Sequence, residues 1–129
     1  MTTVLDDVIR ACGPALAPHA LSNPPDGRFE GLDGDPARRF VLEAVYEGYL
    51  LHYARSRVFD IADEDLRLLA GDALYALGLS RLAEAGDLEA VAELCDLISR
   101  SAQVHAEGRG AEADALWDAS ARVLRGTPR

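Results

Sequence analysis

The chain has 129 residues, of which 49% are hydrophobic and 27% are charged, a composition typical of one globular domain. Its formal net charge is −9, and all 13 basic residues are arginine. A surface this acidic repels a phosphate backbone, so we expect no nucleic-acid partner. The lack of lysine also excludes a Schiff-base or P-loop lysine in this chain.

The sequence predicts a soluble, cytoplasmic protein. The first ten residues, MTTVLDDVIR, contain two aspartates and lack the basic region of a secretory signal. The longest uncharged apolar run, residues 73–79, is too short for a transmembrane segment. Without a secretory signal, Cys12 and Cys95 are expected to be buried free thiols rather than a disulfide.

The N-terminal half predicts two helices separated by a long loop. A first helix is expected over residues 3–12, where a Gly-Pro pair stops it. The stretch SNPPDGRFEGLDGD, residues 22–35, predicts a loop that is either functional or mobile. An aspartate followed by proline then predicts the start of a second helix over residues 36–57.

The C-terminal half predicts three more helices. They are expected over residues 64–85, 88–107 and 111–125, the first two after a capping aspartate and each before a glycine. Helical periodicity dominates, and no segment alternates as a strand would. The sequence therefore predicts one all-α domain of about five helices over residues 1–129, with its core bundle over residues 36–125.

The third predicted helix is apolar around most of its circumference, which is typical of a helix that is central in a bundle or covered by a partner. Gly71 and Gly78 lie one heptad apart in it. Each costs about 1 kcal/mol relative to alanine inside a helix, so both predict close approach of another helix. Asp72 lies in the same run and would need a polar partner if buried.

No catalytic or metal-binding motif is found in the sequence. The Glu-x-x-His pairs of di-iron bundles are missing. The acidic run DIADED, residues 60–65, lacks the glycine and glutamate spacing of a calcium loop and is expected to be a helix N-terminal cluster. No G-x-S-x-G elbow occurs, and neither cysteine has a basic neighbour. We therefore assign no catalytic residue and no metal ligand to this chain.

Aromatic residues form a pattern on the second predicted helix. Tyr46, Tyr49 and Tyr53 fall at positions i, i+3 and i+7, which predicts a continuous ridge that is more often core or interface than a ligand wall. His52 lies among leucines and tyrosines. It could act as a general base, but a lone histidine in this setting is more often packed and hydrogen-bonded.

Three stretches resemble helices of the polyprenyl diphosphate synthases, which are all-α prenyltransferases. EAVYEGYLLHYARSR (residues 43–57) resembles the helix E-x-x-H-x-x-x-L-x-H-D-D-x-x-D, whose aspartates hold magnesium against the allylic diphosphate. LAGDALYALGLSRLAEAGD (residues 69–87) resembles a later helix, A-G-D-x-L-L, and EAVAELCDLISRSAQVHAEG (residues 89–108) is similar to the helix that follows it.

The chain departs from this family at the metal site. The positions of the three aspartates carry Tyr53, Ala54 and Arg57, and the second aspartate-rich motif and the arginine-rich loop are also missing. The resemblance therefore implies the small, non-catalytic subunit of two-component hexaprenyl or heptaprenyl diphosphate synthases. It implies a truncated half of the isoprenoid synthase fold that binds no cofactor itself, because Mg²⁺ would belong to a catalytic, DDxxD-bearing partner chain.

We expect the surface that faces this partner or the product cavity to lie on the second and third helices, at Gly48, Tyr49, His52, Tyr53, Gly71, Asp72, Tyr75 and Gly78. Two alternatives remain open. One is a homodimer or larger homo-oligomeric helical adaptor without enzymatic activity, joined through the aromatic ridge and the third helix. The other is a small enzyme or sensor that uses His52, Asp72 and the tyrosines around an apolar ligand pocket.

Overall fold

The computed structural model describes residues 3–29 and 35–125, and the predicted all-α single domain is confirmed over them. Five α-helices and two 3₁₀ turns are present, and the described residues contain no strand apart from one isolated bridge between Ala20 and Phe59. In chain order the elements are α1 (Val4–Ala11), η1 (Ala17–His19), α2 (Pro36–Tyr53), α3 (Glu64–Glu84), α4 (Leu88–Ala106), η2 (Gly110–Glu112) and α5 (Ala113–Arg125).

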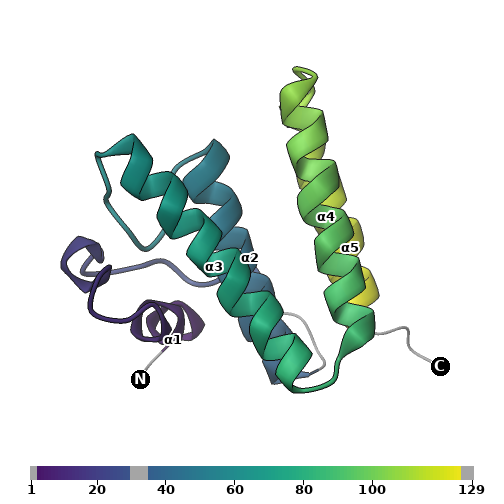
Figure 1. Ribbon diagram of the computed structural model, residues 1–129, viewed down its shortest axis with the longest axis horizontal. Helices are drawn as coiled ribbons and strands as arrows, with labels where there is room; N and C mark the ends of the chain where they lie inside the picture. Colours follow the sequence, from purple (N-terminus) through teal and green to yellow (C-terminus); the bar gives the residue numbers. More distant parts are fainter. Residues whose placement is uncertain (1–2, 30–34, 126–129) are drawn as a thin grey trace.

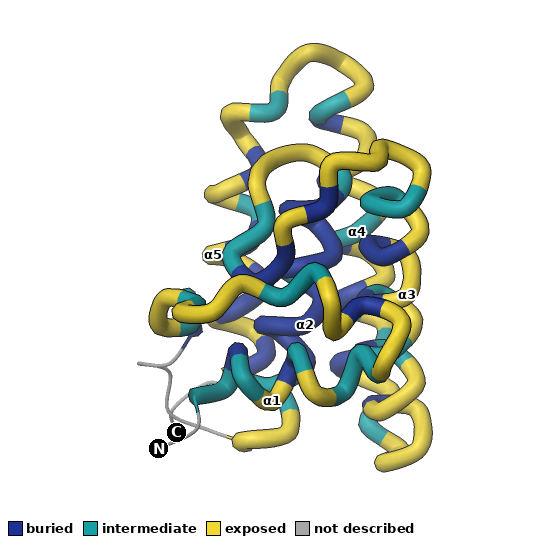
Figure 2. Tube along the Cα trace, turned by 90° about the vertical axis from the view of Figure 1, so that its left-hand side faces the viewer, coloured by how far each residue is buried: buried dark blue, intermediate teal, exposed yellow. Residues whose placement is uncertain are grey.

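Two helical hairpins make up most of the fold, one formed by α2 and α3 and the other by α4 and α5 (Figure 1). Helix α2 is the central element, because it contacts α1, α3, α4 and α5. Burial follows this arrangement: α2 is mostly buried, whereas the loops and the outer faces of the other helices are exposed (Figure 2). No helix of the described chain is long and apolar enough to span a bilayer.

The helix starts follow from local sequence. Asp35, Asp63 and Asp87 each accept a hydrogen bond from a backbone N–H of the helix that follows, as predicted. Thr3 caps α1 in a reciprocal capping box with Asp6. The acidic run at residues 60–65 thus begins a helix, and the described residues contain no cluster of three or more His, Cys, Asp or Glu suited to a metal ion.

Two boundaries differ from the prediction. Helix α2 ends at Tyr53 rather than near residue 57, because the backbone of Ala54 leaves the helical conformation (φ −148°, ψ −141°). The following residues, Ser56 and Arg57, fold back to hydrogen-bond the side chain of Glu47 on α2. Helix α5 begins at Ala113, after a 3₁₀ turn.

The apolar core has two parts, and α2 contributes to both. One part lies between α2, α4 and α5 and contains Trp117, which is fully buried. The other lies between α1, α2 and α3 and contains Leu5 and Leu74. The N-terminal segment therefore packs on the bundle. Of the loop predicted over residues 22–35, residues 30–34 lie outside the described part of the chain, and Phe29 just before them is buried against the Trp117 ring.

The close helix approach predicted at Gly71 and Gly78 is confirmed, and the helix that approaches is α2 of the same chain. A Cβ atom placed on Gly71 would lie 3.0 Å from the carbonyl oxygen of Gly48, and one on Gly78 would lie 2.5 Å from a methyl carbon of Val45. Neither distance leaves room for a side chain. The helix surrounded on several sides is α2, while α3 leaves Leu69 65% exposed on its outer face.

Both cysteines are free thiols, as predicted, but Cys12 is only partly buried and Cys95 is exposed. Cys12 follows α1, and burial raises the pKa of its thiol to about 11, with a smaller contribution from the nearby Glu47 carboxylate. A thiol with this pKa is a weak nucleophile at neutral pH. The expectation that Cys95 is buried is wrong, because it lies on the exposed face of α4.

One arginine joins α2 to the start of α4 and to the end of α5. The Arg38 guanidinium donates two hydrogen bonds, of 2.7 and 2.8 Å, to the carboxylate of Asp87, and a third to the carbonyl oxygen of Leu124 at 2.9 Å. Asp87 is also the N-cap of α4. The hydrogen bonds from Arg38 hold the pKa of Asp87 below its ordinary value of 3.8.

This depressed pKa predicts an acid-dependent loss of stability. A carboxylate whose pKa is lower in the folded state stabilises the fold above its unfolded pKa, and this contribution is lost as the pH falls through the folded value. Asp87→Asn keeps a capping side chain but removes the charge. We expect its destabilising effect, measured by urea unfolding, to be full at pH 7 and to shrink below about pH 4. The exposed pair of Asp96 with Arg100 provides a control, Asp96→Asn, and an effect of Asp87→Asn that is constant with pH would contradict the assignment.

Candidate functional site

The predicted aromatic ridge is present, and it faces the second hairpin of the same chain. The rings of Tyr46 and Tyr49 stack with centroids 5.8 Å apart, and Tyr49 and Tyr53 lie 5.2 Å apart. Trp117 on α5 packs against the ridge, 5.0 Å from Tyr46 and 5.6 Å from Tyr49. Tyr53 is at the end of the ridge and remains 38% exposed. Most of the ridge is thus part of the core between hairpins.

A second histidine, which no sequence pattern indicated, completes the far end of the ridge. The Tyr49 hydroxyl lies 2.7 Å from Nε2 of His105 on α4, and the ring of Tyr53 stacks on that of His105 at 4.1 Å. Burial raises the pKa of Tyr49 to about 12, so its hydroxyl stays protonated at neutral pH. This cluster joins α2 to the last turn of α4, whereas Arg38 joins α2 to the start of α4 and the end of α5.

His52 is packed and hydrogen-bonded, which is the alternative that the sequence analysis favoured. Its ring stacks on Tyr75 of α3 at 5.3 Å, and its Nε2 lies 2.9 Å from a carboxylate oxygen of Asp72. Burial also raises the pKa of Tyr75. The Asp72 side chain is 66% exposed, so it does not need the buried partner that its apolar neighbours suggested. A histidine–carboxylate pair can move a proton, but neither residue lines the pocket described below.

The eight residues expected to face a partner or cavity divide into two groups. The glycines Gly48, Gly71 and Gly78 are buried where α2 meets α3. The other five, Tyr49, His52, Tyr53, Asp72 and Tyr75, belong to the hydrogen-bonded and stacked cluster that runs from α3 across α2 to α4. Of this cluster, Tyr53 and Asp72 are the exposed members.

Sequence reasoning missed a pair of buried carboxylates on α2. Glu43 and Glu47 both have side chains that are 0% exposed, one helical turn apart. Arg57 lies between them: Nη1 donates to Glu43 at 3.0 Å, and Nε donates to Glu47 at 3.0 Å. The backbone N–H of Arg57 donates to Glu47 at 2.9 Å, and the hydroxyl of Ser56 also binds this carboxylate. One arginine thus bridges two acids that water does not reach.

The loop before α2 satisfies the remaining acceptors of Glu43. The backbone N–H groups of Arg28 and Phe29 donate to its two oxygens, at 3.1 and 2.9 Å. The ring of Tyr46 lies between two guanidinium groups, 4.8 Å from that of Arg28 and 4.9 Å from that of Arg57. A signal was present in the sequence, since Glu43 and Glu47 share a helix face with apolar residues. The partner could not be identified because Arg57 lies outside the helix.

This network determines what the end of α2 can bind. Divalent metals in proteins are held by carboxylates that are free to coordinate them. The only two carboxylates within α2 are those of Glu43 and Glu47, and both are already bound by Arg57. The other positions that the resemblance aligns with metal-binding aspartates hold Tyr53, stacked on His105, and Ala54. The described part of α2 therefore offers no unengaged carboxylate for a metal.

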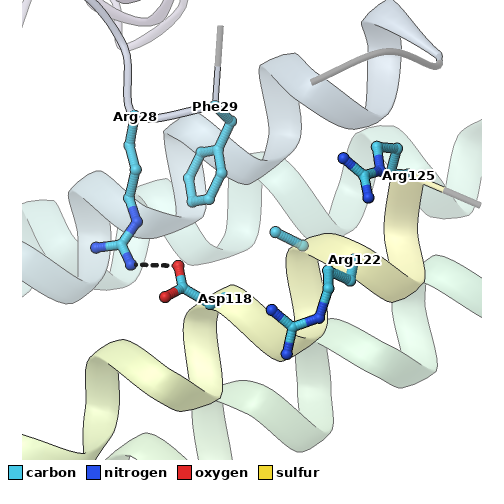
Figure 3. Close-up of a pocket in the computed structure, with 6 residues that line it drawn as sticks. Arg28, Phe29, Asp118, Arg122 and Arg125 are labelled. Carbon is cyan, nitrogen blue, oxygen red and sulfur yellow. Dashed lines mark hydrogen bonds and ion pairs between the residues drawn. The ribbon is translucent and has the colours of Figure 1, made fainter. Parts of the chain in front are cut away.

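A pocket of about 330 Å³ lies between the loop before α2 and one face of α5 (Figure 3). The ring of Phe29 lies on one side of it and the guanidinium of Arg125 on the other, with the ion pair of Arg28 and Asp118 at one end. The lining residues are Arg28, Phe29, Asp118, Ala121, Arg122 and Arg125. The residues that meet here are up to 97 positions apart in sequence (125 − 28), which is why no local pattern indicated the pocket.

Comparisons with protein families, with curated proteins and with solved structures gave no match to this chain.

Proposed function

We propose that this chain is a non-catalytic helical subunit that acts by contact with a partner protein, and that the partner is the catalytic chain of a long-chain polyprenyl diphosphate synthase. In this proposal the chain completes the assembly and shapes the cavity that receives the growing product. The choice of partner rests on the sequence resemblance. The non-catalytic role is supported by the geometry of α2.

The observation that carries the proposal is the position of Arg57. In the resemblance this residue stands where a catalytic chain has its third metal-binding aspartate. Here its side chain is 14% exposed, and its guanidinium binds Glu43 and Glu47 inside the fold. A positive charge held about 3 Å from each carboxylate neutralises both acids, and the position itself carries no carboxylate that could bind a metal. A chain built in this way would depend on a partner for metal-assisted ionisation of a diphosphate.

A homo-oligomeric adaptor is the second candidate, and the outer face of α3 favours it. Leu69 is 65% exposed there, beside the small exposed residues Ala73, Ala76 and Ser80. Small side chains allow another helix to come close. Burial of a large exposed leucine against that helix would stabilise the contact. The same face would serve a contact with a catalytic chain, so oligomeric state and activity together separate the two candidates.

Reconstitution tests the proposal. We expect neither this chain nor a DDxxD-bearing long-chain synthase chain from the same organism to elongate a short allylic diphosphate efficiently alone. Mixed at equal concentration, the two should give a rise in product of at least about tenfold, the effect of about 1.4 kcal/mol in an activation barrier. Product formation is followed by chromatography of the dephosphorylated lipids, and complex formation by sedimentation.

A pair of surface variants makes the test specific. Leu69→Asp should prevent the activation while leaving the fold intact, because the side chain is already exposed. Val123→Asp, on the 46% exposed position of α5, is the matched control and should still activate. Product that does not change on mixing would refute the synthase role. A symmetric dimer that Leu69→Asp dissociates would then support the adaptor.

A further inference from the structure

The pocket of Figure 3 has a charge opposite to that of the protein around it. Its lining includes three arginines and one aspartate, whereas the whole chain carries a net charge of −9. Asp118 is engaged by Arg28, with its carboxylate 2.9 Å from the guanidinium. Asp114, outside the pocket, also contacts Arg28 at 3.3 Å. The remaining positive charge on the lining is that of Arg122 and Arg125.

Arg122 and Arg125 have no ion-pair partner within residues 3–29 and 35–125. Basic residues in the last turn of a helix are favoured by its dipole, which accounts for their presence on α5. The dipole does not account for their placement, since it would be served equally on any face of the helix. Both line the one face of α5 that looks toward Phe29 across a cavity.

The opposite wall is fixed in place. The Arg28 guanidinium lies over the rings of both Phe29 and Tyr46, at 5.7 and 4.8 Å, and donates to the Tyr46 hydroxyl at 2.9 Å. Phe29 is only 3% exposed and packs against Trp117. The backbone of both residues is bound to the buried Glu43. A wall held this firmly requires little ordering when a ligand binds.

We propose that this pocket binds a small organic anion, with its phosphate or carboxylate group on Arg122 and Arg125 and its apolar part against Phe29 and Ala121. Guanidinium groups bind both kinds of oxyanion through paired N–H donors. A volume of about 330 Å³ is at the small end of the range for ligand pockets. This site is distinct from the partner contact proposed above and does not depend on it.

Phenyl phosphate is the first probe, because it joins a phosphate to one aromatic ring. Titration of the full chain, followed by backbone amide NMR shifts, should show saturable binding with the largest shifts at residues 28–29 and 118–125. The double variant Arg122→Gln/Arg125→Gln should weaken binding at least tenfold. Both side chains are exposed, so the variant should fold as the parent does, which its amide spectrum will show directly. The double variant Arg55→Gln/Arg100→Gln, at two exposed arginines outside the pocket, is the charge-matched control and should bind as the parent does.

Two further ligands identify the chemistry. Benzoate presents a carboxylate on the same ring, and whichever of benzoate and phenyl phosphate binds more tightly names the preferred oxyanion. Inorganic phosphate lacks the ring and should bind at least tenfold more weakly than phenyl phosphate. Three results would each overturn the proposal. One is equal binding of inorganic and phenyl phosphate, and another is equal weakening of binding in the Arg122/Arg125 variant and in the Arg55/Arg100 control. The third is the lack of saturable binding of either aromatic ligand in the millimolar range.

Discussion

Replacing Arg57 with glutamine is expected to lower the free energy of unfolding by about 3–5 kcal/mol, the cost of removing one partner from a buried ion pair. Glu43 and Glu47 are both fully buried, and the Arg57 guanidinium contacts each of them at 3.0 Å. Without it, two negative charges would remain one helical turn apart with no counterion. Urea unfolding monitored by circular dichroism at 222 nm measures the change.

The neighbouring arginine gives the control. Arg55 lies two residues earlier in the same loop and is exposed. Arg55→Gln removes the same charge and should change the free energy of unfolding by no more than about 0.5 kcal/mol. A double variant, Arg57→Gln combined with Glu47→Gln, should recover part of the stability lost in Arg57→Gln, because only one uncompensated carboxylate then remains. Equal effects of the Arg55 and Arg57 substitutions would mean that Arg57 is not the internal counterion.

The second large effect is expected at Gly48, where the backbones of α2 and α3 approach closely. A Cβ atom at this position would lie 2.8 Å from the carbonyl oxygen of Gly71 and 2.8 Å from the ring of Tyr75. The carbonyl belongs to the backbone and can move only if α3 moves. Gly48→Ala should therefore cost about 1–3 kcal/mol from overpacking, of which the better helix propensity of alanine offsets about 1 kcal/mol.

Two measurements separate these opposing contributions. Ala76→Gly, at an exposed position of α3, should destabilise by about 1 kcal/mol from propensity alone and so calibrates that term in this fold. Adding this value to the loss of stability measured for Gly48→Ala gives the steric cost at Gly48. A Gly48→Ala variant that is more stable than the parent in urea would show that the helices are farther apart at this point than the structure places them.

The parts of the fold that could be predicted from sequence are those fixed by neighbouring residues. Capping by Asp63 and Asp87 needs only the next turn of the helix, so these helix starts were predicted. Gly71 and Gly78 showed that a helix approaches, because an interior glycine is costly without such a contact. That the approaching helix is α2 depends on the tertiary fold, which periodicity does not specify.

The candidate sites were predicted less completely, for reasons that differ between residues. The Tyr46–Tyr53 ridge was visible because helical spacing alone brings its members together. His105 was not, since its contact with Tyr49 joins residues 56 positions apart. Arg57 was assigned to the end of a helix, whereas the chain turns after Tyr53 and brings it back onto Glu47. Asp72 lies in an apolar run but on its exposed side, and the run alone could not show which side that was.

The contacts of Arg57 also bear on the composition of the chain. The chain has 13 arginines and no lysine, and a bias in nucleotide composition alone could explain this usage. On that explanation, most of the arginines could be exchanged for lysine without consequence. Position 57 is an exception. Its Nε, Nη1 and Nη2 atoms donate to Glu47, to Glu43 and to the Glu43 carbonyl oxygen, in three directions from one flat group. The ammonium group of a lysine has neither that shape nor that reach. Arginine is therefore required at position 57 by its contacts, whatever nucleotide bias accounts for the other arginines.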